Sequence, residues 1–146
     1  MQNLCEISFL AISENEALAR MIVSAFVMPW NPTIEELADV KTAISEAVTN
    51  AILHGYNLDG KSMVHLRCEQ QGNCFTFRVL DYGVGMENVE KAMEPLYTSK
   101  PELERSGMGF SFMEAFMDCL EVESEVGNGT IVTMKKWFGS KTELEE

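Results

Sequence analysis

Long apolar segments are missing from this chain. No stretch approaches the roughly 18 consecutive apolar residues of a membrane-spanning helix. The first six residues, MQNLCE, lack the basic start and apolar run of a secretory signal peptide. None of the four cysteines stands in a C-x-x-C pair, and no pair of histidines accompanies them, so we expect no zinc site. These absences favour a cytoplasmic protein with reduced cysteines and no membrane contact.

Basic residues are also scarce. Eleven Lys and Arg stand against 23 Asp and Glu, which gives a formal net charge of -12 and a pI near 4.5. A field of that sign repels phosphate backbones, so direct binding of nucleic acid is not expected. It either favours a basic protein partner or serves only solubility. The P-loop pattern G-x-x-x-x-G-K-[ST] and a strand-following G-x-G-x-x-G are both absent, which excludes two common nucleotide-binding folds.

The composition that remains fits one globular domain. The chain has 146 residues, 46% of them hydrophobic, with no repeat and no linker-like segment. Hydrophobic periodicity predicts the order β-α-α-β-β-lid-α-β-β, with hairpins around residues 71–73 and 127–129. This order is typical of an α+β sandwich, in which helices cover one face of a mixed, mostly antiparallel sheet. We expect the domain to span residues 1–138 and residues 139–146 to form a flexible tail.

Two Ser/Thr-x-x-Glu patterns predict helix starts. Ser13 with Glu16, and Thr33 with Glu36, each match a capping box, in which the side chains and backbone N–H groups bond reciprocally. The second box opens the longest periodic run of the chain, which Gly55 is expected to end. Its apolar stripe consists of Leu37, Val40, Ile44, Ala47, Val48 and Ala51.

Glu46 and Asn50 are the first candidate functional pair. They lie four residues apart on the predicted helix and therefore share a face, close to the alanines of the stripe. The Asn50 amide offers an oxygen to a hard divalent cation, and the Glu46 carboxylate offers a base to an attacking hydroxyl or water. Taken alone, the pair also fits an ordinary solvated helix face.

Two glycine patterns follow. Asp81, Gly83 and Gly85 form a D-x-G-x-G turn after a predicted strand. Asp81 is suited to accept a hydrogen bond from the exocyclic amine of a base such as adenine, and Gly83 and Gly85 allow the backbone to approach a flat ligand closely. Gly107 and Gly109 stand at a predicted helix start, where free N–H groups favour phosphate. Each pattern alone also fits a plain turn or helix start.

In their order along the chain, these patterns resemble the GHKL superfamily of ATPases, whose domain is the Bergerat type. Residues 46–51 (EAVTNA) resemble its N-box, and residues 81–85 (DYGVG) and 107–109 (GMG) resemble its next two boxes. Residues 127–130 (GNGT) resemble the last box, where Thr130 supports adenine recognition. Two longer runs, 46–56 (EAVTNAILHGY) and 98–110 (TSKPELERSGMGF), resemble the anti-sigma F factors of spore-forming bacteria.

This resemblance implies a biochemical role. Such proteins are dimeric serine kinases that hold the sporulation sigma factor F when ATP is bound and phosphorylate a serine of its anti-anti-sigma antagonist. By the same resemblance, Glu46 is the base for the serine hydroxyl, Asn50 ligates Mg²⁺, Asp81 reads adenine, and Arg105 stabilises charge on the γ-phosphate. The implied contacts to ATP or ADP in the lid are Thr98, Ser99, Lys100, Ser106, Gly107, Met108 and Gly109.

Partner contacts and other functions stay open at this level. Glu16 and Arg20 are candidate partner contacts, although they also fit a solvated helix face. An ATPase switch that uses water as acceptor needs the same Glu46, whereas a nucleotide-gated binding module would not need a carboxylate there. A detached histidine-kinase catalytic domain is disfavoured, because neither His54 nor His65 lies in a phosphoacceptor helix.

Overall fold

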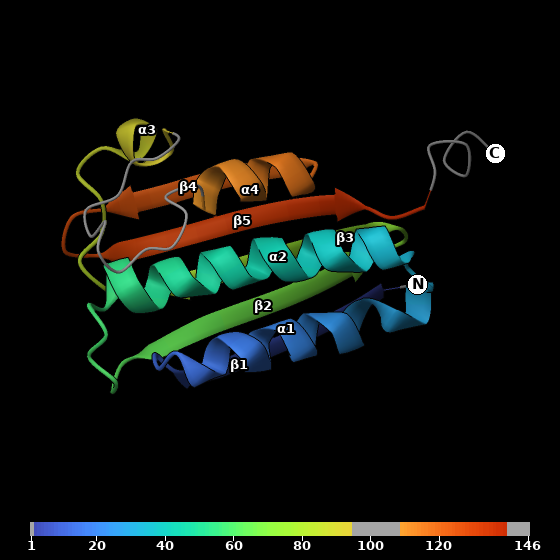
Figure 1. Ribbon diagram of the computed structural model, residues 1–146, viewed down its shortest axis with the longest axis horizontal. Coiled ribbons are helices and arrows are strands. Elements are labelled where there is room, and N and C mark those ends of the chain that lie inside the picture. Colours follow the sequence, from blue (N-terminus) through green and yellow to red (C-terminus); the bar gives the residue numbers. More distant parts are fainter. Residues whose placement is uncertain (1, 95–108, 140–146) are drawn as a thin grey trace.

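The computed structural model describes residues 2–94 and 109–139, in two layers (Figure 1). Residues 140–146 of the tail predicted at 139–146, and most of the predicted lid, lie outside these ranges. The described elements are β1 (Gln2–Leu10), α1 (Glu14–Val27), a 3₁₀ turn (Met28–Trp30), α2 (Ile34–Asn50), a π-helical turn (Ala51–Gly55), β2 (Met63–Gln71), β3 (Cys74–Asp81), α3 (Val89–Ala92), α4 (Gly109–Phe116), β4 (Cys119–Glu125) and β5 (Gly129–Trp137).

The five strands form one sheet in the order β1-β2-β3-β5-β4. All four pairings are antiparallel, so between the described strands the sheet is antiparallel rather than mixed. Helices α1, α2 and α4 lie side by side on one face, with α2 in the middle (Figure 1). The predicted α+β sandwich is thereby confirmed. No helix in the described ranges has the length and apolarity that crossing a bilayer requires.

The core lies between α2 and the sheet. Val40, Ile44 and Val48 of the predicted stripe are fully buried, and they face a sheet surface that includes Phe75 and Phe77, also fully buried. Burying side chains of this size contributes about 1.5–3 kcal/mol each. The apolar stripe therefore fixes which face of α2 meets the sheet, and the opposite flank presents Glu46 and Asn50.

The two predicted capping boxes differ in outcome. At Thr33 the box is confirmed: the Glu36 N–H donates to Thr33 Oγ1 at 3.0 Å, and the Thr33 N–H donates to Glu36 Oε1 at 2.8 Å. At Ser13 the prediction is wrong, because Ser13 has helical backbone angles and makes no side-chain cap bond. The Glu16 carboxylate instead accepts a hydrogen bond from the Ser45 hydroxyl of α2, so a tertiary contact replaces the local cap.

Candidate functional site

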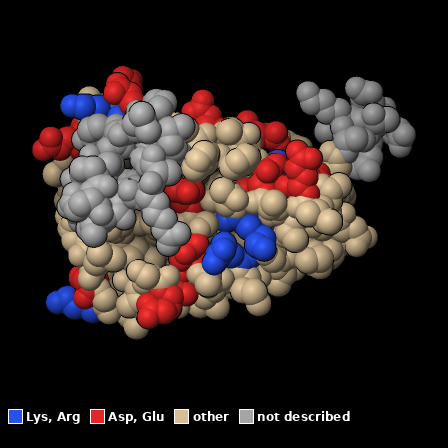
Figure 2. Space-filling view, in the orientation of Figure 1, with Lys and Arg blue, Asp and Glu red and all other residues tan. Residues whose placement is uncertain are grey.

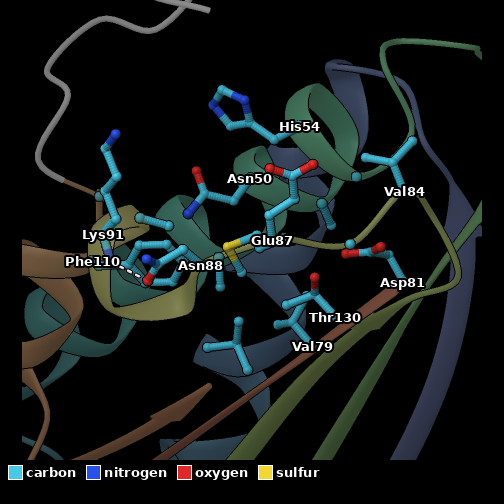
Figure 3. A pocket seen from close by; sticks show the side chains of 18 of the residues that line it. Asn50, His54, Val79, Asp81, Val84, Glu87, Asn88, Lys91, Phe110 and Thr130 are labelled. Carbon is cyan, nitrogen blue, oxygen red and sulfur yellow. Dashed lines mark hydrogen bonds between the residues drawn. The ribbon is translucent and has the colours of Figure 1, made fainter. Parts of the chain in front are cut away.

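A cavity of about 520 Å³ opens where the end of α2 meets the turn after β3, helices α3 and α4, and strand β5. A volume of this size is typical of small-molecule and cofactor sites. Five residues predicted from the sequence line it: Asn50, Asp81, Gly85, Gly109 and Thr130. Figure 3 shows Asp81 and Thr130 together on the sheet side, with Asn50 and Lys91 toward the opposite end. The cavity thus has an end with a buried acceptor and an end with an amide and a cation.

Asp81 is the buried acceptor. It is the last residue of β3, pairs with Thr130 of β5, and is 5% exposed. Burial raises the pKa of its carboxyl to about 6, although backbone N–H groups of Gly83 and Thr130 act in the opposite direction. Asp81 Oδ1 accepts from the Gly83 N–H at 2.9 Å. A buried carboxylate that is ionised at neutral pH favours a ligand that donates a hydrogen bond to it.

The glycines around Asp81 are required by contacts within the protein. A Cβ on Gly83 would lie 1.9 Å from the Gly55 carbonyl oxygen, and one on Gly129 would lie 2.0 Å from the Asp81 carbonyl oxygen. Gly85, which has a φ of +74°, would bring a Cβ to 2.1 Å from the carbonyl oxygen of Glu125. The sequence interpretation assigned Gly83 and Gly85 to close approach of a ligand. In the structure the close approach at both glycines is to other backbone segments of the protein, and of these two residues only Gly85 lines the cavity.

The start of α4 lies against the side of α2 that carries Glu46 and Asn50. A Cβ built on Gly109 would lie 3.1 Å from Glu46 Oε2 and 3.4 Å from Asn50 Nδ2. The structure therefore brings Glu46, Asn50 and Gly109 together, as the order of the sequence patterns requires. Glu46 and Asn50 are both half-buried, but only Asn50 lines the cavity.

The side chains that could ligate a metal ion at this site are few. Within the described ranges, no three His, Cys, Asp or Glu side chains are grouped to hold an ion by themselves. Asn50 supplies one hard oxygen donor to the cavity, which suits a magnesium ion that takes its other ligands from phosphates and water. The residues present fit such a shared ion and do not form a closed protein cage.

A serine that the sequence patterns missed organises the acceptor end. Ser124 Oγ of β4 accepts from the Met86 N–H at 2.8 Å and lies 2.8 Å from Thr130 Oγ1 and 3.1 Å from the Gly129 carbonyl oxygen. Ser124 belongs to no motif and alternates with charged residues on a strand, so no signal in the sequence distinguishes it. Other lining residues outside the predicted set include His54, Glu87, Asn88, Lys91, Phe110 and Ser111.

Other predicted residues lie away from the cavity or outside the described ranges. Glu16 and Arg20 are not among its lining residues; on α1 they form an ion pair with Nε and Oε1 3.3 Å apart, and Glu16 also accepts from Ser45. The predictions that fall outside the described residues are Thr98, Ser99, Lys100, Arg105, Ser106, Gly107 and Met108.

Comparison with known proteins finds relatives over nearly the whole length of the chain. The profile of a family described as "Histidine kinase-like ATPase domain" matches residues 9–136. The anti-sigma F factor of Clostridium beijerinckii is 56% identical over 136 residues, covering 93% of this chain and 95% of its own. The anti-sigma F factor of Clostridium perfringens strain SM101 is 57% identical, with coverages of 93% and 97%.

A solved structure shares the fold. The RsbU and RsbW domains of a Mycobacterium tuberculosis protein match with a TM-score of 0.68 and 19% identity, over 93% of this chain and 32% of that longer one. At this identity the likeness concerns the fold alone. The matches at 56–57% identity extend over nearly the whole length of both proteins. The chain belongs to the anti-sigma F factor family and carries that family's histidine kinase-like ATPase domain.

Proposed function

We propose that this protein is an ATP-dependent anti-sigma factor, which binds and inhibits sigma factor F and phosphorylates a serine of the anti-anti-sigma protein in the cytoplasm. The observation that carries the proposal is the meeting of Glu46, Asn50 and Gly109 beside a cavity whose far end holds Asp81. A base, an amide oxygen and a helix start are the groups that phosphoryl transfer needs at the phosphate end. The relatives that carry the name anti-sigma F factor support the partner.

The cavity accommodates ATP in one direction. The adenine amino group donates to Asp81 beside Thr130, and the phosphates extend toward Asn50 and the start of α4. Backbone N–H groups at a helix start favour phosphate oxygens, and Gly109 lets the backbone approach because it has no side chain. Asn50 would hold a Mg²⁺ ion, which neutralises negative charge on the phosphates when bound.

Glu46 provides the acid–base chemistry. Its carboxylate takes the proton from the acceptor serine as the serine oxygen bonds to the γ-phosphorus. The bond from the γ-phosphorus to the β–γ bridging oxygen breaks, and ADP leaves with that oxygen. The Arg105 and lid contacts implied by the resemblance remain part of this proposal.

Transfer of label tests the reaction. Purified protein is incubated with ATP labelled on the γ-phosphate and with an anti-anti-sigma protein. Label on a serine of that protein supports the kinase, whereas label that appears only as inorganic phosphate supports an ATPase switch with water as acceptor. Replacing Glu46→Gln should slow transfer by roughly 10²–10⁴-fold with little change in ATP affinity. Glu35→Gln, an exposed carboxylate on the same helix, is the matched control.

The partner surfaces are a separate part of the proposal. The helix face carries acidic side chains around a smaller basic group (Figure 2), and the chain as a whole has a net charge of -12. Such a field favours association with basic protein segments. Glu16 and Arg20 on α1 remain the candidate contacts for a protein partner. Sigma retention in a pull-down should be greater with ATP than without it, and equal retention would contradict the switch.

We also propose a homodimer, formed through the sheet face opposite the helices. Across that face Glu6, Arg67, Arg78 and Glu121 lie in one register row, so it carries both signs of charge. No described helix covers it (Figure 1). A face with both signs can complement a second copy about a twofold axis. Sedimentation equilibrium checks this, and a monomer throughout the micromolar range would contradict it.

A further inference from the structure

The segment that leaves α2 is wound more loosely than the helix before it. Ala51–Gly55 forms a π-helical turn, in which the Tyr56 N–H donates to the Ala51 carbonyl oxygen at 2.9 Å. Single π turns inserted in α-helices occur frequently at functional sites. The wider turn carries Gly55 and Tyr56 from the helix bearing Glu46 and Asn50 to the turn that follows Asp81.

Tyr56 connects that turn to the start of β2. Its hydroxyl donates to the Met63 carbonyl oxygen at 2.7 Å and accepts from the Tyr82 N–H at 2.7 Å. The ring is 8% exposed, so water has little access to replace these bonds. Burial also raises the pKa of Tyr56, which keeps the hydroxyl protonated and able to donate. Both hydrogen-bonding roles of the hydroxyl are therefore used within the protein.

The neighbouring amides are held as well. The Gly83 N–H donates to Asp81 Oδ1 at 2.9 Å, and the Val84 N–H donates to the Gly55 carbonyl oxygen at 2.9 Å. Three successive N–H groups, those of Tyr82, Gly83 and Val84, are thus bound without any ligand. A turn with three successive amides engaged is preorganised, so little ordering remains to be done when a ligand binds.

Gly55 makes room for the carboxylate in this arrangement. A Cβ on Gly55 would lie 2.7 Å from Asp81 Oδ1 and 2.8 Å from Asp81 Oδ2. A side chain at position 55 would push the carboxylate out of its present position. Gly55 was expected from the sequence to end the helix; its helical segment does end there, and the missing side chain serves the approach of Asp81.

We propose that Tyr56, with Gly55 before it, is a positioning residue for nucleotide selectivity. Its hydroxyl holds the Tyr82 amide, and through it the turn that aims the Asp81 carboxylate at the amino group of adenine. This inference rests on the proposed binding of ATP by Asp81. It assigns to Tyr56 no contact with the nucleotide.

A comparison of two nucleotides tests the role. ATP carries an amino group at position 6 of its base, whereas inosine triphosphate carries a carbonyl oxygen that an acceptor such as Asp81 repels. The wild-type chain should bind ATP at least about tenfold more tightly than inosine triphosphate, since a hydrogen bond to a charged group is at stake. In Tyr56→Phe this ratio should fall by about tenfold, mainly through weaker binding of ATP. Tyr82→Phe, which removes an exposed hydroxyl from the same turn, should leave the ratio unchanged.

The outcomes separate the inference from the proposed function. If the wild-type chain binds both nucleotides equally, the assignment of Asp81 to adenine fails, and the role of Tyr56 fails with it. If the wild-type chain prefers ATP and Tyr56→Phe keeps the full preference, the proposed function stands and the role of Tyr56 is overturned. A purely structural role predicts that both affinities fall together with the ratio preserved, which also overturns it.

Hydrogen exchange of the wild-type chain provides a second measurement if Tyr56→Phe does not fold. The Tyr82 amide should be protected before nucleotide is added, because the Tyr56 hydroxyl already binds it. ATP should add little to that protection. An amide that exchanges freely in the nucleotide-free protein, and becomes protected only with ATP, would overturn the proposal.

Discussion

Replacing Asp81→Asn should make the nucleotide-free protein more stable at neutral pH and weaken its binding of ATP. The pKa of Asp81 is about 6, against an ordinary value of 3.8. This difference of about 2 units corresponds to about 3 kcal/mol by which the protein disfavours the ionised carboxylate. The neutral amide of Asn does not incur this free-energy cost of burying a charge. Asn Oδ1 would accept the Gly83 N–H as Asp81 Oδ1 does now, which turns the NH₂ group toward the adenine amine.

The pH dependence isolates this residue from the others. Because the folded pKa is raised, protonation of Asp81 stabilises the fold fully below about pH 3.8, and this stabilisation is lost as the pH rises through about 6. From pH 7 to pH 5 the wild-type chain should gain about 1.3 kcal/mol relative to Asp81→Asn, because all other groups titrate in both proteins. Urea unfolding at the two pH values measures the difference.

A matched control comes from Asp59, an exposed carboxylate whose pKa is lowered by hydrogen bonds from Ser62 and from the Lys61 N–H. Asp59 stays ionised at pH 5 and at pH 7, so Asp59→Asn should show no change in relative stability over that window. The reasoning is refuted if the Asp81→Asn difference is the same at pH 5 and pH 7. It is also refuted if the variant binds ATP as tightly as the wild-type chain.

Three further substitutions test other parts of the site and fold. Gly109→Ala places a Cβ 3.1 Å from Glu46 Oε2. Serine phosphorylation should therefore slow by about tenfold or more, while the free energy of unfolding in urea is unchanged. An unaltered phosphorylation rate would contradict the proposed position of Glu46. Ser124→Ala removes the hydrogen-bond partner of Thr130 Oγ1 and of the Met86 amide, so ATP affinity measured by calorimetry should fall about fivefold. An unchanged affinity would show that Ser124 does not support the nucleotide site. Thr33→Ala breaks the capping box and should lower the free energy of unfolding by about 1 kcal/mol, whereas Thr33→Ser should retain most of it.

Much of the fold could be predicted because its signals are local. The capping box at Thr33 and the stripe from Val40 to Val48 depend on spacings of three and four residues, which the helix itself imposes. The hairpin turn at Gly72, with a φ of +58°, follows from a residue that tolerates that conformation. The failed box at Ser13 had the same local pattern, but Ser45, 29 residues away from Glu16, bonds its carboxylate.

By itself the sequence determined the order of the elements, the helix that carries Glu46 and Asn50, and the resemblance to a family. It also predicted that Asp81 is an acceptor for a ligand. Those are properties of composition, period and local motif. Only the tertiary structure decided which groups meet around the cavity. Tyr56 holds an amide 26 residues away, and Ser124 holds one 38 residues away. The burial that raises the pKa of Asp81 likewise comes from segments distant in the chain. Contacts of this kind depend on how the helices pack against the sheet. The spacing of residues along the chain therefore does not predict which distant groups will meet.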